Sequence, residues 1–427
     1  MKHEGNDNLA AGKRLLLLCT TTGYQTRAFV EAANKLNLDV VFGTDRCHVL
    51  EDPWQDGALT LRFENARAAA GLVVEYAKNN PVDAIVALGD RTTPTAAWAC
   101  QELGLLYNPP TAAEACRDKY KSRERLRSAG LKVPTYRRFS FDEDARALGL
   151  QMEYPCVLKP LTLAASRGVI RADTPEEFVK AFERIGALLR SPDVQVLREA
   201  TSSFIQVERF IPGREVAVEA LVHRGRLKVL ALFDKPDPLE GPFFEETLYV
   251  TPSRLLAETQ EQIFGAVEQA SNALGLSHGP IHAELRLNRE GAWVLEVAAR
   301  SIGGLCSRAL RFEAGMSLEE LIIRQALGLE ICGVRRESAA AGVMMIPILQ
   351  GGIFERVEGL EAARETPGVE EITITAKAEQ KLVPLPEGAS YLGFIFARGL
   401  TPEFVEDALR RAHQKVEFRI RPVLPVA

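Results

Sequence analysis

The chain has 427 residues, of which 46% are hydrophobic and 26% are charged. This length predicts roughly two to four domains, each large enough to bury a core of its own. The 52 lysine and arginine residues are outnumbered by 57 acidic residues, which gives a net charge of −5. Because nucleic-acid-binding proteins normally present a basic face, this mild acidity argues against a nucleic-acid partner.

Hydropathy and cysteine usage exclude further classes. No apolar run approaches the roughly 20 residues that a membrane span requires, and residues 1–14 lack the apolar core of a secretion signal. The cysteines are odd in number and include no Cys-x-x-Cys pair, so we expect reduced core residues rather than disulfides or a zinc site. The sequence therefore predicts a cytoplasmic protein without a membrane partner. The seven cysteines are Cys19, Cys47, Cys100, Cys116, Cys156, Cys306 and Cys332.

Short apolar runs alternate with helical patterns over the first hundred residues. The expected strands are 14–19, 39–43, 84–88 and 105–107, and the expected helices are 25–36, 66–78 and 95–103. This alternation predicts a doubly wound parallel sheet in a domain over residues 1–113. Its first loop lacks the Gly-x-Gly-x-x-Gly spacing, so we expect the domain to shape a substrate pocket and an interface without binding a nucleotide.

The pattern of predicted elements changes after a long basic helix expected at 111–128. Residues 114–330 form a second region of strands, hairpins and helices, and residues 331–427 form a third, α+β unit. The expected strands are 154–159, 203–210, 214–222, 226–233, 281–287, 292–297, 342–348, 371–375 and 392–397; the expected helices are 175–189, 253–274, 318–327 and 402–413. The fold class is thus multidomain, α/β at the N-terminus and α+β beyond it.

The hairpin at 281–297 carries two carboxylates that simple register places opposite each other. Glu284 and Glu296 are symmetric about the turn at 289–291, and alternation puts both on one face, with Leu285, Leu287, Trp293, Leu295 and Val297 on the core face. Facing like charges are destabilising, whereas a hard divalent cation with oxygen ligands, such as Mg²⁺, would stabilise them. The alternative is a shifted register and a solvated polar face.

Basic residues accompany this pair. Arg300 lies an even number of residues beyond Glu296, so it falls on the same face if the strand continues, and its planar fork suits a phosphate or carboxylate. Lys159 ends an apolar strand, where an unpaired ammonium is costly. The loop at 161–169 contains Ser166-Arg167-Gly168 and can bring backbone N–H groups near phosphates. Each feature alone is more often structural, but their order is informative.

The order Lys119, Lys159, Ser166-Arg167-Gly168, Glu208, Glu215, Glu284, Glu296, Arg300 resembles the ATP-grasp superfamily over about residues 1–330. The superfamily pattern at the second acid is Glu-x-Asn-x-Arg, whereas this chain has Glu296-Val297-Ala298-Ala299-Arg300. The substitution removes one typical metal ligand, and it is similar to the pattern of bacterial L-amino acid ligases, which join amino acids into dipeptides. The run at 279–284 resembles the same subgroup. The resemblance implies an ATP-grasp domain over 114–330, with a lid subdomain over about 135–212.

The resemblance also implies a nucleotide site. Lys119 and Lys159 would hold the phosphates of ATP, together with the loop that carries Ser166, Arg167 and Gly168. Glu208 and the backbone of Phe210 and Ile211 would read the adenine, and Glu215 would bind the ribose hydroxyls. This loop departs from the superfamily pattern in being poorer in glycine than in many relatives.

For the reaction, the resemblance implies that Glu284 and Glu296 bind two Mg²⁺ (or Mn²⁺) ions and that Arg300 stabilises the phosphate or the adduct. A carboxylate would attack the γ-phosphate of ATP, and an amine would attack the resulting acyl phosphate, with release of ADP and phosphate. The expected partners are small-molecule carboxylate and amine substrates. The enzyme is expected to be a homodimer.

Four further positions are weaker substrate candidates. Glu246 lies in a loop that approaches the substrate in the resembling ligases, and His282 is an even step from Glu284, although a solvated loop and a structural histidine are alternatives. Gly303 and Gly304 follow Arg300 and allow the backbone to approach a ligand closely. Competing functions are another ATP-grasp enzyme, of purine-biosynthetic or biotin carboxylase type, and a non-catalytic nucleotide-binding protein.

Overall fold

The computed structural model describes residues 10–20, 23–45, 58–331 and 333–423. The expectations for Cys47, Cys332 and residues 1–9 lie outside these ranges. The other five cysteines are buried and free, as their apolar surroundings predict. Among the described residues, none of the helices combines the length and the apolar character that crossing a bilayer demands.

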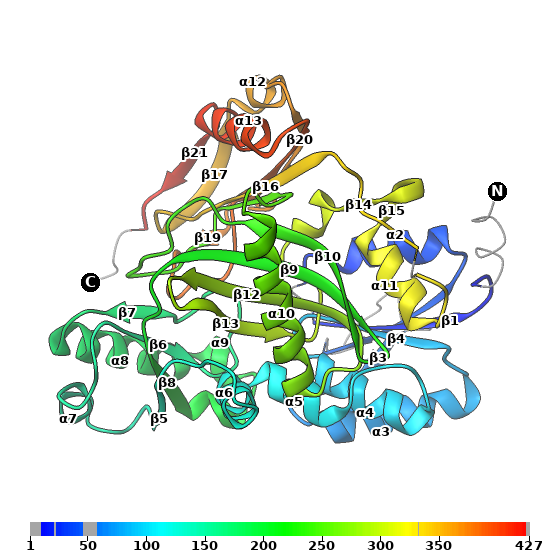
Figure 1. The fold of residues 1–427 in the computed structure, drawn as a ribbon, viewed down its shortest axis with the longest axis horizontal. Helices are drawn as coiled ribbons and strands as arrows, with labels where there is room; N and C mark the ends of the chain where they lie inside the picture. Colours follow the sequence, from blue (N-terminus) through cyan, green and yellow to red (C-terminus); the bar gives the residue numbers. More distant parts are fainter. Residues whose placement is uncertain (1–9, 21–22, 46–57, 332, 424–427) are drawn as a thin grey trace.

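The N-terminal region is a four-stranded parallel sheet in the order β3-β2-β1-β4 (Figure 1). Alternate residues of β1 face two separate cores: Leu16 and Leu18 pack toward α3 and α4, whereas Leu15 and Leu17 pack toward α2 and α11. The predicted doubly wound arrangement is therefore confirmed. The elements are β1 (Arg14–Cys19), α2 (Thr26–Lys35), β2 (Asp39–Thr44), β3 (Ala58–Thr60), α3 (Ala66–Asn79), β4 (Ala84–Leu88) and α4 (Thr93–Leu103), with α11 (Leu318–Ala326) contributed from far along the chain.

Two predicted elements at the end of this region are wrong. Residues 105–107 are not a strand, because Gly104 takes the left-handed conformation at the end of α4 and the chain turns back, with the Leu105 N–H donating to Cys100 O. The long helix expected at 111–128 is two helices, α5 (Pro110–Arg117) and α6 (Lys119–Ser128). Asp118 between them is extended, and its carboxylate accepts from the N–H groups of Tyr120 and Lys121, which caps α6.

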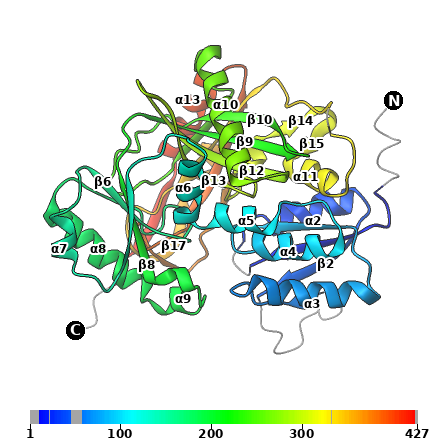
Figure 2. The ribbon, with the colours of Figure 1, turned by 60° about the horizontal axis from the view of Figure 1, so that its bottom comes forward.

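The lid sheet is four-stranded and antiparallel, in the order β5-β8-β6-β7. Helix α8 covers one face through Phe178, Phe182 and Ile185. In Figures 1 and 2 the lid and the N-terminal sheet lie on opposite sides of the molecule. The elements are β5 (Tyr136–Ser140), α7 (Ala145–Gly149), β6 (Cys156–Pro160), β7 (Ile170–Ala172), α8 (Pro175–Leu189), α9 (Pro192–Gln195) and β8 (Phe204–Arg209).

An eight-stranded antiparallel sheet forms the centre, in the order β13-β12-β9-β10-β11-β16-β20-β18. Helix α10 packs on it and begins at Ala257 rather than Ser253, because Asp234 accepts from the Ser253 hydroxyl and the Arg254 N–H and holds this segment outside the helix. The elements are β9 (Arg214–His223), β10 (Arg226–Asp234), β11 (Leu248–Thr251), α10 (Ala257–Leu274), β12 (His278–Asn288), β13 (Gly291–Ala298), β14 (Arg311–Phe312) and β15 (Met316–Ser317).

The last part of the chain adds β16, β20 and β18 to the central sheet and also forms a small sheet of its own. Strand β16 pairs with β11, so the expected α+β unit at 331–427 shares its largest sheet with the region before it. Helix α13 packs on these strands, and a three-stranded sheet in the order β19-β17-β21 lies beside them. The elements are β16 (Ala340–Ile346), β17 (Gly352–Glu358), α12 (Leu360–Arg364), β18 (Val369–Ile374), β19 (Lys381–Leu382), β20 (Gly393–Gly399), α13 (Pro402–Gln414) and β21 (Glu417–Arg421).

Candidate functional site

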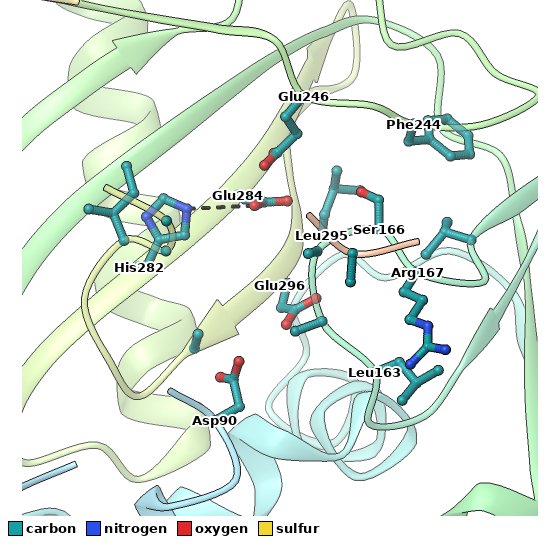
Figure 3. Close-up of a pocket in the computed structure, with 18 of the residues that line it drawn as sticks. Asp90, Leu163, Ser166, Arg167, Phe244, Glu246, His282, Glu284, Leu295 and Glu296 are labelled. Carbon is teal, nitrogen blue, oxygen red and sulfur yellow. Dashed lines mark ion pairs between the residues drawn. The ribbon is translucent and has the colours of Figure 1, made fainter. Parts of the chain in front are cut away.

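A cavity of about 490 Å³ lies where the N-terminal sheet, the lid and the central sheet meet. It is lined from all parts of the chain: Asp90 follows β4, Lys159 lies near the end of β6, Glu284 and Glu296 lie on β12 and β13, and Tyr391 precedes β20. Figure 3 shows the carboxylates of Asp90, Glu246, Glu284 and Glu296 around a common space. The cavity is therefore the one place where the sequence-predicted acids and bases gather among the described residues.

Glu284 and Glu296 face each other as predicted, but the strand register that brings them together differs from the simple register assumed from the sequence. Strand residues Glu284 and Glu296 are direct partners across β12 and β13. The turn, however, pairs Asn288 with Gly291, and this register would place Leu295 opposite Glu284. A bulge between Glu284 and Leu285 takes up Leu295 as an extra residue and brings Glu296 into place.

The same bulge changes which residues of β13 face the core. Leu285 and Val297 are buried as expected. Trp293 and Leu295 are not in the core; Val294 is buried in their place, and Leu295 lines the cavity. One extra residue in a strand reverses the alternation beyond it, so Trp293 is predicted on the wrong face.

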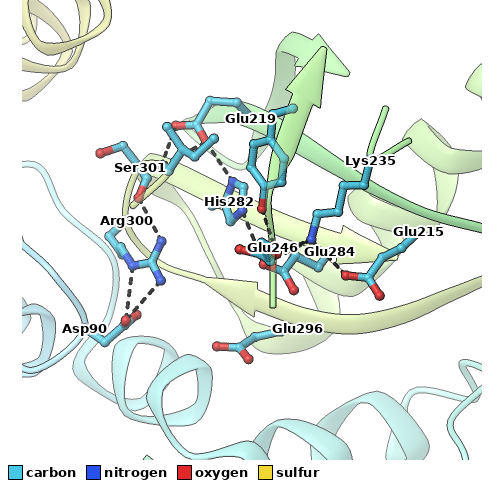
Figure 4. Close-up of polar contacts among 12 residues, drawn as sticks. Asp90, Glu215, Glu219, Lys235, Glu246, His282, Glu284, Glu296, Arg300 and Ser301 are labelled. Atoms are coloured by element: carbon cyan, nitrogen blue, oxygen red, sulfur yellow. Dashed lines mark hydrogen bonds and ion pairs between the residues drawn. The ribbon is translucent and has the colours of Figure 1, made fainter. Parts of the chain in front are cut away.

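Lys235, at the end of β10, is a central residue that the sequence analysis missed. Its ammonium lies 2.8 Å from Glu215 Oε1 and 3.7 Å from Glu284 Oε1, and it also pairs with Glu246 (Figure 4). The oxygens of these three glutamates lie within 4.8 Å of one another. The signal that singled out Lys159, a lysine closing a buried apolar strand, is present here too and would have found it.

The carboxylates of this cluster titrate differently because their neighbours differ. Burial raises the pKa of Glu284, and the negative charges of Glu215 and Glu296 add to this, against the opposing effect of Lys235. Burial also raises the pKa of Glu246. For Glu215, burial is outweighed by Lys235 and Arg286, so its pKa lies below the ordinary value. The cluster thus carries more negative charge than Lys235 alone balances, which suits a cation.

The predicted adenine reader Glu208 is held by cations. Arg123 Nε donates to Glu208 Oε1 at 2.6 Å, Gln206 donates to the same oxygen, and Lys159 pairs with the other. Burial acts to raise the pKa of Glu208, but Arg123 and Lys159 outweigh it and lower the pKa to about 2. Burial lowers the pKa of Lys159. Glu208 lines the cavity as the counterion of Lys159, a role the sequence did not predict.

Phe210 and Ile211 line the same cavity with part of their backbone already engaged. Glu215, the predicted ribose residue, does not line it, although its carboxylate lies within 4.8 Å of oxygens of Glu246 and Glu284, which do. The N–H of Phe210 donates to Pro155 O, and the carbonyl of Ile211 accepts from Arg286 at 2.8 Å. Arg286 also donates to Glu215 at 3.0 Å. The Phe210 N–H and the Ile211 carbonyl are therefore not free to read a base, whereas the Phe210 ring lies between the guanidinium groups of Arg171 and Arg286.

Lys119 and the loop at 161–169 close the cavity from the lid side. Lys119 Nζ lies 3.4 Å from Glu296 Oε2 and donates to Leu163 O at 3.0 Å. Ser166 and Arg167 line the cavity, but Gly168 does not: its N–H donates to Pro386 O. Because its N–H is engaged there, a contact of Gly168 with a phosphate stays a prediction.

Arg300 is fixed by a partner from the N-terminal region. Its Nε and Nη2 both lie 3.1 Å from Asp90 Oδ2. Burial acts to lower the pKa of Arg300, but Asp90 and Glu296 outweigh it and raise the pKa. Burial acts to raise the pKa of Asp90, and Arg300 and Lys119 reverse this, so the pKa of Asp90 lies below its ordinary value. No local sequence signal marked Asp90, because its partner is 210 residues away.

All four weaker substrate candidates, Glu246, His282, Gly303 and Gly304, line the cavity. The nearby His278 does not; its ring packs against His223 and bonds to Gln325 O. A Cβ on Gly304, whose φ is +61°, would lie 3.1 Å from the Phe394 ring, so glycine is needed there for close packing as well as for backbone freedom.

Three family models match separate parts of the chain: an ATP-grasp N-terminal domain over residues 30–105, an ATP-grasp domain over 152–309 and an L-amino acid ligase C-terminal domain 2 over 344–421. The structure of an L-amino acid ligase from Bacillus licheniformis is similar, with a TM-score of 0.80 and 29% identity over 96% of this chain and 99% of that one.

Among curated relatives, alanine–anticapsin ligase of Bacillus subtilis is 31% identical over 265 residues, which are 59% of this chain and 55% of the relative. The match thus spans about half the length of that ligase. An uncharacterised protein of Sinorhizobium fredii, y4rH, is 23% identical over 96% of this chain and 84% of its own length. The chain therefore carries an ATP-grasp N-terminal domain, an ATP-grasp domain and the C-terminal domain 2 of the L-amino acid ligases.

Proposed function

We propose that this protein is an ATP-dependent ligase that joins a small carboxylate to an amine, with amino acids as the substrate class, and releases ADP and phosphate. The observation that carries the proposal is the convergence of Glu284, Glu296, Lys119 and Arg300 on one cavity, in a chain with an L-amino acid ligase C-terminal domain. That cavity is closed on several sides by three regions of the chain, which suits an intermediate that must be shielded from water.

The nucleotide would lie between the lid and the central sheet. Lys119 and Lys159 would hold its phosphates, with Ser166 and Arg167 beside them. The adenine end would face Phe210 and Ile211, and Glu215 would accept from the ribose. The engaged backbone groups of Phe210 and Ile211 favour recognition through their remaining polar atoms and through stacking.

The donor set at Glu284 and Glu296 fits Mg²⁺ (or Mn²⁺). Facing carboxylates supply the hard oxygen ligands that Mg²⁺ prefers, and few protein ligands leave positions for water and phosphate oxygens. When bound, the ion would neutralise charge on the phosphates. Lys235 already balances part of the charge of this cluster, so it would share the neutralisation with the ion.

The remaining cavity residues would bind the two substrates and support the reaction between them. The carboxylate oxygen would attack the γ-phosphorus and expel ADP. The amine nitrogen would then attack the carbonyl carbon of the acyl phosphate, lose a proton and displace inorganic phosphate. Arg300, held by Asp90, would bind the transferred group, and Gly303, Gly304, Glu246 and His282 would surround the two substrates. No side-chain nucleophile is required.

An ADP-release screen tests the proposal directly. Pairs of amino acids, and other small carboxylates with amines, are incubated with ATP and Mg²⁺, and the nucleotide products are separated by chromatography. ADP that depends on both substrates is expected. AMP as the stoichiometric product indicates adenylation and contradicts the proposal, and ADP formed with bicarbonate alone favours the biotin carboxylase type.

The competing functions have less support. Purine-biosynthetic relatives such as phosphoribosylglycinamide synthetase of Anaerococcus prevotii are 18% identical, with a TM-score of 0.66, and share the fold. A non-catalytic protein would be free to lose Glu284, Glu296 or Arg300, and all three are present and convergent. The cytoplasmic location and the homodimer remain predictions; sedimentation of the purified chain measures the latter.

A further inference from the structure

Glu219 is a buried carboxylate that the proposed reaction leaves without a role. It lies on β9 with 0% exposure and does not line the cavity. Its neighbour across the sheet is His282 on β12, and Glu219 Oε2 lies 3.1 Å from His282 Nδ1 (Figure 4). A carboxylate this deep in a sheet is costly unless its oxygens are hydrogen-bonded, so its contacts account for its presence.

The second contact of Glu219 is with the turn that follows Arg300. The Ile302 N–H donates to both carboxylate oxygens, at 3.2 and 3.0 Å. From the other side, Gln25 of the N-terminal region donates to the Ile302 carbonyl. The turn that carries Gly303 and Gly304 is thus held at one residue by side chains from two regions of the chain.

These two contacts set how His282 meets the cavity. The Ile302 N–H donates to both oxygens of Glu219, so the carboxylate is the acceptor here, and the geometry pairs it with an Nδ1–H of His282 and leaves Nε2 able to accept. Burial raises the pKa of Glu219, and its contacts with His282 and Ile302 oppose this. Nε2 lies 3.6 Å from Glu284 Oε1 at the cavity wall. With the hydrogen on Nδ1, Nε2 can accept an N–H from a molecule bound in the cavity.

We propose that Glu219 is a positioning residue that fixes His282 and the turn at Ile302 so that His282 Nε2 receives an N–H of the amine substrate. This inference rests on the proposed ligase function, which brings an amine to the cavity. Glu219 itself touches no substrate. Partners that orient a functional side chain typically change activity by about 10- to 100-fold when they are replaced.

The first test is spectroscopic and does not need activity. Histidine-¹⁵N-labelled full-length protein is measured by long-range ¹H–¹⁵N correlation, and His282→Asn assigns the His282 signals. The pattern of a ring protonated on Nδ1 is expected in the wild type. Glu219→Gln is nearly isosteric and can still accept from Ile302, but its amide can donate to Nδ1, so the His282 pattern should shift toward the Nε2–H form.

Glu320→Gln is the matched control. Glu320 is also a buried carboxylate, 3% exposed, and it accepts from Arg324 and Lys35, away from the cavity. Its replacement should leave the His282 signals unchanged. A His282 pattern that is the same in wild type and Glu219→Gln overturns the proposal, whatever the ligase assay shows.

The second test is kinetic, with a substrate pair found by the ADP-release screen. Glu219→Gln should raise the KM for the amine by about tenfold or lower kcat by about 10- to 100-fold, with the KM for ATP changed less than about threefold. Equal losses for ATP and amine would show general damage and overturn the positioning role. A shifted His282 pattern in a chain that forms no ADP with any pair supports the positioning by Glu219 but refutes the ligase function and, with it, the amine contact.

Discussion

Glu296 faces Glu284 across two strands and lies 3.4 Å from Lys119, with its side chain one-third exposed. We predict that Glu296→Ala lowers the rate of ADP formation by at least about 100-fold, because charge on the phosphates loses its stabilisation. Because removing one of two facing like charges relieves repulsion, the free energy of unfolding should change by less than about 0.5 kcal/mol. Chromatographic ADP assays and thermal circular dichroism measure the two effects.

The control for this change is Glu290→Ala, which removes an exposed glutamate from the turn of the same hairpin. It should leave both the rate and the melting temperature unchanged. A Glu296→Ala protein that melts normally and retains near-wild-type turnover would refute the assigned metal ligand.

Asp90 gives a prediction about pH. Its pKa is depressed in the folded protein by Arg300 and Lys119, so the ion pair contributes stability above the ordinary aspartate pKa of about 4 and loses it as the pH falls toward the folded pKa. We predict that Asp90→Asn costs about 1–3 kcal/mol at pH 7, since Arg300 loses its partner. The cost should be constant from pH 8 to 5 and shrink below about pH 4.

Urea unfolding at pH 7, 5 and 3.5 measures this cost. A difference between wild type and Asp90→Asn that grows on acidification would contradict the assignment. The variant should also turn over more slowly, because the fork of Arg300 is no longer held on the cavity side.

At the scale of elements, the lid is fastened to the C-terminal region at one short segment. Arg184 of α8 makes two hydrogen bonds to the Glu387 carboxylate, at 2.6 and 2.9 Å, and Arg167 donates to the Glu387 carbonyl. The N–H of Gly168 donates to Pro386 O beside them. Opening of the loop at 161–169 therefore requires these contacts to break.

We predict that Glu387→Ala increases the rate of tryptic cleavage in the loop at 161–169 by up to about fivefold, since a partly exposed ion pair is worth at most about 1 kcal/mol. ATP should suppress the cleavage in both proteins. Glu361→Ala, which removes an exposed ion pair to Arg364 in the same region, is the control and should have no effect. Cleavage that ATP fails to slow would contradict the view of this loop as part of the lid.

At the scale of the whole molecule, the shared sheet makes the C-terminal region indispensable. Strand β16 covers the edge of β11, and Leu248 and Val250 are buried against the core of the last region. A protein truncated after residue 339 would expose this edge and apolar surface, and exposed strand edges promote aggregation. We predict that this truncated protein aggregates in size-exclusion chromatography and binds a hydrophobic dye. A control chain that ends at residue 423 should elute as the full-length protein does.

The sequence by itself determined most of the elements and one part of the site. Helix α8 and the strand–helix alternation of the N-terminal region follow from periodicity and turn residues, which are local signals. The order of Lys119, Lys159, Glu284, Glu296 and Arg300 predicted residues that do line one cavity. These residues could be predicted from the sequence because each motif lies within a short stretch of chain, even though the residues come together only in the folded protein.

Only the tertiary structure determined the partners of the charged residues and the fine register. Asp90 meets Arg300 across 210 residues. Lys235 meets Glu215 where β9 and β10 pair, and it meets Glu246 from the loop before β11. The bulge at Leu295 and the break at Asp118 depend on a backbone conformation that no periodicity encodes. A buried charge needs a partner, but which partner it finds is set by the packing of distant elements and not by its neighbours in sequence.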